Sequence, residues 1–212
     1  MGSRGPGLGR DGGLSMNELR TLYPTPSPLA VAKQLDRLDS HAMAFIRRSP
    51  FLVLATADAA GHCDASPRGD APGFVELIDE AQLLIPDRPG NNRLDSLANI
   101  ATNPRLGMLF FVPGVLETLR VNGSAILVRD PAQLARHAVT GRTPKTGLLV
   151  RVEEVFFHCG KALKRSALWD SSLHAAPGEI PSLGRILADQ TGRIGVEEAE
   201  ARVTTGYRDH LY

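Results

Sequence analysis

Two arginines lie beside the predicted start of a helix, where positive charge is normally unfavourable. Arg88 comes just before that start and Arg93 lies in the first turn, because Asn91 or Asn92 is a suitable N-cap. The buried stripe of this helix is expected to comprise Leu94, Leu97 and Ile100. A helix N-terminus carries partial positive charge and free N–H donors. A bound phosphate would be stabilised by this arrangement.

The two arginines have an alternative arrangement, in which they point into solvent or pair with Asp87 and Asp95. The motif alone does not decide between the two. A second cluster, Lys161 and Arg165, lies on one face of a predicted helix, where like charges four residues apart repel each other unless an anion joins them. Side chains that simply extend into water are again the alternative. One phosphorylated ligand would account for both clusters.

Two extended segments offer groups that suit a flat ligand. Residues 66–77, SPRGDAPGFVEL, combine glycine and proline with a β-like pattern, so their backbone could bind the edge of a heteroaromatic ring. A plain loop with Arg68 on the surface is the alternative. In residues 117–123, ETLRVNG, Thr118 and Arg120 share one face of a strand, which is open either to solvent or to a ligand.

Other chemistries have no support in the sequence. The nucleophile elbow, the HExxH motif, the P-loop and the dinucleotide-binding glycine motif are all missing. The pairs His62-Cys63 and His158-Cys159 are adjacent in predicted strands, so their side chains point to opposite faces and cannot easily chelate. We therefore expect no metal site.

The segments that must position these residues are mostly short strands at hairpin spacing. Strand-like runs cover residues 51–58, 62–70, 73–79, 82–87, 105–112, 116–130 and 147–159, with Gly123 marking a bulge or bend. Helical patterns cover residues 29–48, 131–139, 161–170, 183–190 and 196–210. This predicts a mainly β protein with peripheral helices, built on a closed or nearly closed antiparallel barrel.

Composition narrows the class further. A chain of 212 residues with a formal charge of +1 can form one sizeable domain and has no electrostatic footprint for nucleic acid or a membrane. The N-terminal residues 1–28 lack a secretory signal and are expected to be disordered. Two unpaired cysteines fit a reducing compartment, so we expect a cytoplasmic protein.

The chain resembles the pyridoxamine 5'-phosphate oxidase-like FMN-binding split-barrel superfamily, in particular a branch of uncharacterised flavin-binding proteins. The motifs that carry the resemblance are PDRPGNNRLDSLANI, ETLRVNG and FHCxKAxxRSxLW, and it covers about residues 35–170. It implies a six-stranded antiparallel split β-barrel and a homodimer with two FMN sites at the subunit interface. We accordingly expect the barrel domain at residues 29–170 and a helical extension of it at residues 171–212.

The resemblance also implies cofactor-binding roles. The FMN phosphate is expected to contact Arg88, Asn91, Asn92 and Arg93. The isoalloxazine ring is expected to lie along Asp70, Gly73, Phe74 and Val75, after Arg68, with Thr118 at the ring edge and Arg120 nearby. The partner subunit is expected to supply Lys161, Arg165 and Ser166.

The function that the resemblance implies is an FMN-dependent oxidoreductase acting on an unidentified small substrate, with no residue needed as a general acid or base. The alternatives are a flavin carrier or sensor without turnover, or a barrel that uses haem or a deazaflavin. Glu76 stands where the vitamin B6 oxidases have a phosphate-contacting lysine, which argues against oxidation of pyridoxamine phosphate itself. Replacing Arg88 or Arg93 by alanine is expected to release flavin with little loss of folding.

Overall fold

The computed structural model describes residues 13–212, which divide into two compact units, residues 13–34 and residues 35–212. In the first unit, α1 (Met16–Leu22) begins with a capping box between Ser15 and Glu18, and α2 (Pro28–Ala32) begins at a proline. The disorder predicted for residues 1–28 concerns in part residues 1–12, which lie outside the described residues. The second unit begins at Leu35.

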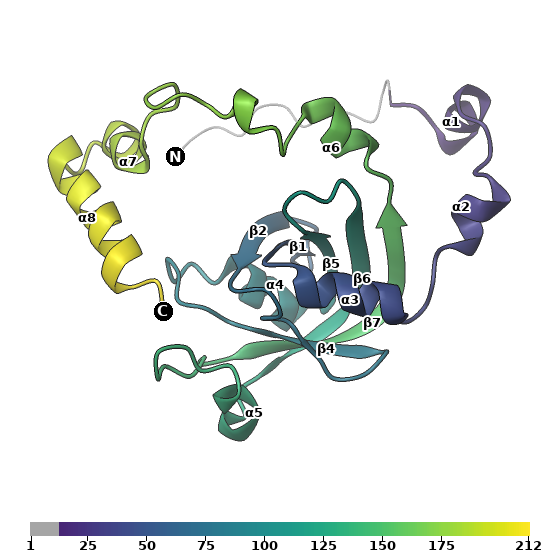
Figure 1. Cartoon of the computed structure of the whole chain (residues 1–212), viewed down its shortest axis with the longest axis horizontal. Helices are drawn as coiled ribbons and strands as arrows, with labels where there is room; N and C mark the ends of the chain where they lie inside the picture. The colour runs from purple at the N-terminus through teal and green to yellow at the C-terminus, as the bar shows by residue number, and fades with distance from the viewer. Residues whose placement is uncertain (1–12) are drawn as a thin grey trace. The chain divides into compact units, whose positions relative to one another are not determined.

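The second unit is built on one curved antiparallel sheet, which contains seven strands within residues 13–212 (Figure 1). The strands are β1 (Phe51–Ala57), β2 (Cys63–Gly69), β3 (Glu76–Leu77), β4 (Gln82–Pro86), β5 (Arg105–Phe111), β6 (Thr118–Val128) and β7 (Gly147–His158), in the order β2-β1-β5-β6-β7-β4-β3. This confirms the mainly β split-barrel class. The sheet has seven strands instead of six because the two-residue β3 pairs with β4, and it is not closed.

The helices of this unit flank the sheet. They are α3 (Ser40–Arg48), α4 (Asp95–Thr102), α5 (Pro131–Ala135), α6 (Lys161–Ser166), the short 3-10 helix η1 (Ser171–Leu173), α7 (Leu183–Thr191) and α8 (Val196–Asp209). The single helix predicted over residues 29–48 is wrong. The chain between α2 and α3 is not helical, because Leu35 exchanges backbone hydrogen bonds of 3.0 and 2.8 Å with Val155 and Asp39 caps α3.

The core lies between the concave side of the sheet and two helices. Alternate residues of the long strands are buried there, as the period of a half-buried strand requires: Leu52, Leu54, Met108, Phe110, Leu119 and Val121. Ala42 and Ile46 of α3 and Ile100 of α4 complete the same cluster. Burying each of these large side chains stabilises the fold by about 1.5–3 kcal/mol.

The predicted irregularity at Gly123 is confirmed. The pairing register between β6 and β7 shifts between Asn122 and Gly123, which is a β-bulge. A Cβ atom at position 123 would overlap the main-chain oxygen of Arg151, so the close approach of the two strands requires glycine here. The bulge reverses which side chains of β7 face the core from Val155 onward.

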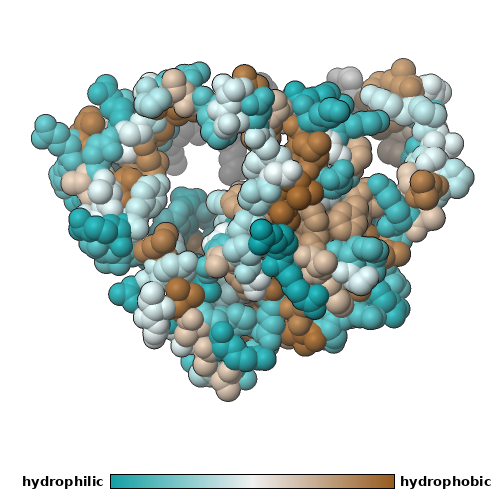
Figure 2. Space-filling model, viewed as in Figure 1, coloured by the Kyte–Doolittle hydropathy of each residue, from teal (hydrophilic) through white to brown (hydrophobic). Residues whose placement is uncertain are grey.

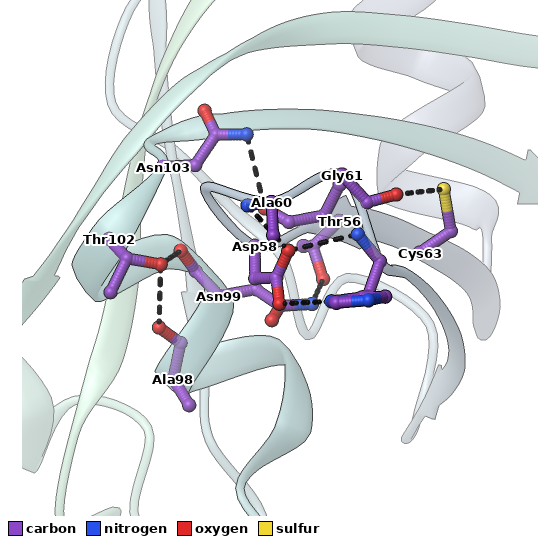
Figure 3. A network of polar contacts seen from close by, with 11 residues as sticks. Thr56, Asp58, Ala60, Gly61, Cys63, Ala98, Asn99, Thr102 and Asn103 are labelled. Carbon is purple, nitrogen blue, oxygen red and sulfur yellow. Dashed lines mark hydrogen bonds and ion pairs between the residues drawn. The ribbon is translucent and has the colours of Figure 1, made fainter.

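Polar contacts fix α4 on the sheet (Figure 3). The Asn99 side chain donates a hydrogen bond of 3.0 Å to the Thr56 hydroxyl, and the Asn103 side chain donates one of 3.1 Å to the Ala57 carbonyl. Both acceptors belong to β1, whose turn to β2 is held by the Asp58 carboxylate through the N–H groups of Ala60 and His62. The C-terminal half of α4 is therefore held on β1, which sets the direction of its N-terminus.

The surface mixes polar and apolar residues, as the face seen in Figure 2 shows. Within the second unit, α7 packs against α8, and Gly184 lies so close to the backbone of Glu200 that a Cβ there would come within 2.7 Å of the Glu200 nitrogen. Among the described residues, no helix combines the length and the hydropathy that a membrane span requires.

Candidate functional site

A cavity of about 760 Å³ opens beside the N-terminus of α4. Its walls come from segments that are distant in the sequence: residues 66–69 at the end of β2, Phe74, residues 86–97, residues 142–145, His210 and Tyr212. The stretch with Arg88 and Arg93 thus forms one wall, and the β2 stretch with Arg68 forms another. The two segments that the sequence selected for binding face the same space.

The start of α4 differs from the sequence prediction. The helix begins at Asp95, and its N-cap is Leu94, which has a left-handed backbone (φ 61°) and provides no capping side chain. Asn92 is also left-handed (φ 58°), and the Asn91 side chain accepts a hydrogen bond of 3.0 Å from the Arg93 N–H instead of capping the helix. Neither asparagine is the N-cap, and Leu94 is 56% exposed rather than part of the buried stripe.

The missing cap has a chemical consequence. The first-turn residues Asp95, Ser96 and Leu97 line the cavity, and among the described residues no side chain caps the start of the helix. Uncapped donors and the positive end of the helix dipole together favour an anion at this point. Ser96 is itself fixed, because its hydroxyl donates a hydrogen bond of 2.6 Å to Asp64 on β2. The site is therefore held in place before any ligand arrives.

Arg88 is part of a buried ion pair. Its Nε lies 2.6 Å from Oδ2 of Asp70, and its Nη1 donates a hydrogen bond of 2.7 Å to the His137 carbonyl. The side chains of Arg88 and Asp70 are 18% and 4% exposed. The sequence left open a pairing with Asp87, and the structure shows Asp70 as the partner. Because removal of Arg88 would leave Asp70 buried without its counter-ion, we now expect Arg88→Ala to destabilise the fold, whereas the sequence alone predicted little loss of folding.

Arg93 is differently placed. It pairs with Asp95 at 2.8 Å, as the alternative in the sequence allowed, but its side chain is 71% exposed. Exposed pairs of this kind contribute about 0–1 kcal/mol, so the guanidinium can exchange Asp95 for a stronger anionic partner at little cost. Arg93 is thus available to a ligand, whereas Arg88 is mainly committed to the fold.

Two carboxyl groups at the cavity have shifted pKa values in opposite directions. Burial raises the pKa of Asp87 above its ordinary value, and the charges of Arg68 and Arg88 only partly oppose this. Burial also acts to raise the pKa of Asp70, but the Ala71 N–H, the Tyr212 hydroxyl and Arg88 together outweigh it, so that pKa is lowered. Asp70 is therefore stabilised as an anion within the fold, whereas burial makes the ionised form of Asp87 less favourable.

The predicted ring-binding strand is only partly at the cavity. Arg68 and Phe74 line it, and Asp70 lies behind its wall in the pair with Arg88. Gly73 has a left-handed backbone (φ 87°) that favours glycine, which explains its place in the turn before Phe74. Val75 is 3% exposed and belongs to the core, so its side chain is not accessible to a ligand.

The remaining predicted residues are not among those that line this cavity: Thr118, Arg120, Lys161, Arg165 and Ser166. Thr118 is buried beside its strand partner His158. Arg120 lies over the Phe156 ring at 5.0 Å and contacts Glu154 at 2.7 Å, yet its buried Nε has no hydrogen-bond partner among the described residues. Within one subunit these side chains form no common site with Arg93.

Sequence reasoning missed several contributors to the cavity, among them His210. Arg142 and Lys145 come from the loop before β7, and Tyr212 comes from the segment after α8. The GRTPK sequence of that loop offered a signal, since a turn sequence with two cations resembles the other cationic segments. Nothing local in the sequence could place Tyr212 there. Among the described residues, no group of three or more metal-ligating side chains is close enough to hold a metal ion.

Comparison with known proteins identifies a protein family that the chain matches. The model of the family described as "Pyridoxamine 5'-phosphate oxidase" matches residues 38–159. Similar solved structures include HupZ of Group A Streptococcus, with 22% identity and a TM-score of 0.46 over 57% of this chain and 93% of that chain. An FMN-binding protein from Syntrophomonas wolfei has 10% identity and a TM-score of 0.41 over 54% of this chain and 86% of its own.

General Stress Protein 26 from Bacillus anthracis is similar at 13% identity and a TM-score of 0.39 over 54% of this chain and 88% of its own. These identities and TM-scores are low, so the assignment depends on the match to the family model. No curated protein matches the chain.

Proposed function

The chain belongs to the pyridoxamine 5'-phosphate oxidase family, and on that premise we propose that it binds FMN and acts as an oxidoreductase on a small substrate. The observation that carries this proposal is the cavity at the uncapped N-terminus of α4, with Arg93 exposed at its edge. A phosphate is the ligand group that such a helix end and an available guanidinium recognise together.

The residues present fit FMN. The phosphate would accept hydrogen bonds from the first-turn N–H groups of α4 and from Arg93, with Asn91 and Asn92 beside it. Arg68 and Phe74, on the opposite wall, would contact the ring system, and Arg88 would contribute its charge from the pair with Asp70. FMN supplies the redox chemistry when bound, and the protein supplies binding, orientation and exclusion of water.

A second copy of the chain completes the proposed site. On the convex side of the sheet a row of neighbouring side chains crosses four strands: Val53, Leu109, Arg120 and Phe156, with Phe51 and Phe111 beside it. Phe51 is exposed and the others are half-buried, which is the composition expected of an interface centre. The unpaired Nε of Arg120 supports a role for this face in binding. Lys161, Arg165 and Ser166 would reach the FMN site from this second subunit, whereas the Thr118 side chain is buried within its own chain.

The experiment that tests the proposal is titration of the purified protein with FMN, followed by absorption and flavin fluorescence. Binding should quench the fluorescence, and Arg93→Ala should weaken binding by about 10-fold or more, since a charge-assisted hydrogen bond to phosphate is lost. Arg202→Ala, which removes an equally exposed arginine that pairs with Glu198 in α8, is the matched control and should bind FMN normally. Normal binding by Arg93→Ala would contradict the phosphate site.

Turnover separates an enzyme from a carrier. Bound FMN that is reduced by NAD(P)H and reoxidised by an electron acceptor at a steady rate supports an oxidoreductase, whereas bound FMN without turnover indicates a carrier or sensor. A haem or deazaflavin protein would be identified by its own absorption bands on titration with those cofactors.

A further inference from the structure

The segment that follows α8 returns to the cavity. The helix ends at Asp209, and within the next three residues His210 and Tyr212 become part of the cavity wall. The rest of the wall is formed by the end of β2, by the loop before α4 and by residues 142–145, all far away in the sequence. Residues 210–212, which we call the strap, therefore contact the site although they belong to the helical extension outside the barrel.

Tyr212 binds to the buried ion pair behind the cavity. Its hydroxyl donates a hydrogen bond of 2.8 Å to Oδ1 of Asp70, while Oδ2 of the same carboxylate contacts Arg88. The Arg88 guanidinium also lies 5.8 Å from the centre of the Tyr212 ring, within the range of a cation–π contact. Tyr212 thus contacts both members of the pair.

Arg142 holds the strap from the other side. Its guanidinium donates a hydrogen bond to the main-chain oxygen of Tyr212. Arg142 belongs to the cavity loop at residues 142–145, so the strap is held between that loop and the Asp70–Arg88 pair. The Asp70 hydrogen bond raises the pKa of the Tyr212 phenol, which stays protonated and able to donate at neutral pH.

The attachment of the strap is local. Two side chains of the strap line the cavity, and its hydrogen bonds to the described part of the barrel are those of Tyr212 with Asp70 and Arg142. Few contacts of this kind can break and re-form without unfolding of the barrel, which is how closing segments of binding sites usually behave.

We propose that residues 210–212 form a strap that closes the cavity over its ligand, with Tyr212 as the latch on Asp70. This inference rests on the proposed function, because the ligand it retains is FMN. The strap controls access to the cavity as well as escape from it. Tyr212 is a positioning residue in this role, acting on the ligand through the closed wall and the Asp70–Arg88 pair.

A closing segment has a kinetic signature that a simple ligand contact lacks. Release of the latch should raise both the association and the dissociation rate constants of FMN, because both steps pass through the open state. Loss of a direct contact should raise the dissociation rate constant alone. Loss of folding should lower the fraction of protein that binds at all.

The test is stopped-flow measurement of FMN fluorescence quenching with the full chain. Tyr212→Ala should raise both rate constants, each by about 5-fold or more, and Tyr212→Phe, which keeps the ring but removes the hydroxyl, should have a smaller effect in the same direction. Tyr207→Ala is the matched control, since Tyr207 is an exposed tyrosine of α8 that lies outside the cavity wall. Rate constants equal to those of the control, or a change in dissociation alone, would overturn the strap.

Hydrogen exchange on the protein without FMN keeps the inference distinct from the proposed function. If the strap is latched, Tyr212→Phe should speed amide exchange at residues 210–212 and 86–95 relative to the unmutated chain, with no change in β6. Failure of the unmutated chain to bind FMN would refute the proposed function, and the exchange result would still decide the latch. Equal amide exchange in Tyr212→Phe and in the unmutated chain would refute the latch.

Discussion

Arg88 and Asp70 form an ion pair at 2.6 Å although 18 residues separate them in the sequence. The pair joins the loop after β4, which lines the cavity, to the turn that follows the cavity-lining end of β2. Because Asp70 is almost fully buried, the pair belongs to the fold as much as to the site. This relationship separates the two arginines that the sequence grouped together, and it determines how their variants should behave.

Arg88→Ala is expected to lower the free energy of unfolding by about 2–4 kcal/mol, because it leaves the Asp70 carboxylate buried with only the Tyr212 and Ala71 donors. Urea unfolding followed by circular dichroism measures this. The double variant Arg88→Ala, Asp70→Ala should recover part of the loss, since the stranded charge is gone. Arg202→Ala removes an exposed ion pair with Glu198 and should change the free energy of unfolding by less than about 1 kcal/mol. Equal stability of Arg88→Ala and Arg202→Ala would show that the pair is not important for folding.

Asp87→Asn is expected to tighten FMN binding at neutral pH by about 3- to 10-fold, because the ionised carboxylate repels a phosphate in the same cavity. In the unmutated protein, the pKa of Asp87 is raised above the ordinary 3.8. The ionised carboxylate therefore lowers the free energy of unfolding at high pH, and this loss disappears as the pH falls through the raised pKa. The stability of the unmutated protein should therefore gain from acidification in that range, and the variant should lack this gain.

Thermal unfolding of the ligand-free proteins between pH 4 and 7 compares the two profiles, and Asp189→Asn in α7 is a matched control with an exposed carboxylate. Identical profiles for the unmutated protein and Asp87→Asn would rule out this role of Asp87.

Mixing two defective subunits tests the shared site. If each site combines Arg93 of one copy with Arg165 of the other, Arg93→Ala and Arg165→Ala homodimers should both bind FMN weakly. Refolding them together should form mixed dimers that carry one intact site each, so about a quarter of all sites should recover normal affinity. FMN titration with sedimentation measurements checks both the binding and the dimer. No recovery in proven mixed dimers would place both residues in one subunit or one of them outside the site.

Gly123→Ala is expected to destabilise the protein by more than about 3 kcal/mol, because the added methyl group overlaps the backbone of β7 at the bulge and neither strand can move without breaking its ladder. Gly206→Ala in α8 is the matched control. Nothing lies within 4 Å of a Cβ there, so this change should stabilise the helix by about 0.5–1 kcal/mol. Denaturant unfolding of both variants gives the comparison, and a mild effect at position 123 would contradict the close approach.

The regular elements were the most predictable part of the fold. The strands β1, β2, β5, β6 and β7 and the helices α7 and α8 lie where alternation and helical spacing predict them, because each is long enough to show its period. The predicted strand over residues 73–79 is reduced to Glu76–Leu77, and two further errors concern helix starts. The helix expected over residues 29–48 is interrupted by a long-range bridge from Leu35 to Val155, and the start of α4 shifts to Asp95 because two residues adopt left-handed backbone conformations. Neither the bridge nor the left-handed turn has a local signal.

The candidate site divides in the same way. The sequence alone identified the residues that could bind a ligand, namely the cations and asparagines before α4 and the glycine-rich stretch after β2. Cations beside a helix N-terminus are unfavourable unless an anion binds there, so residue types and spacing were enough to select them. Only the tertiary structure decided their partners: Arg88 with Asp70, Tyr212 on the same carboxylate, and Arg120 on the opposite side of the sheet from the core. Local patterns report the energetics of neighbouring residues, whereas ion pairs and cavity walls depend on which distant segments the sheet brings together.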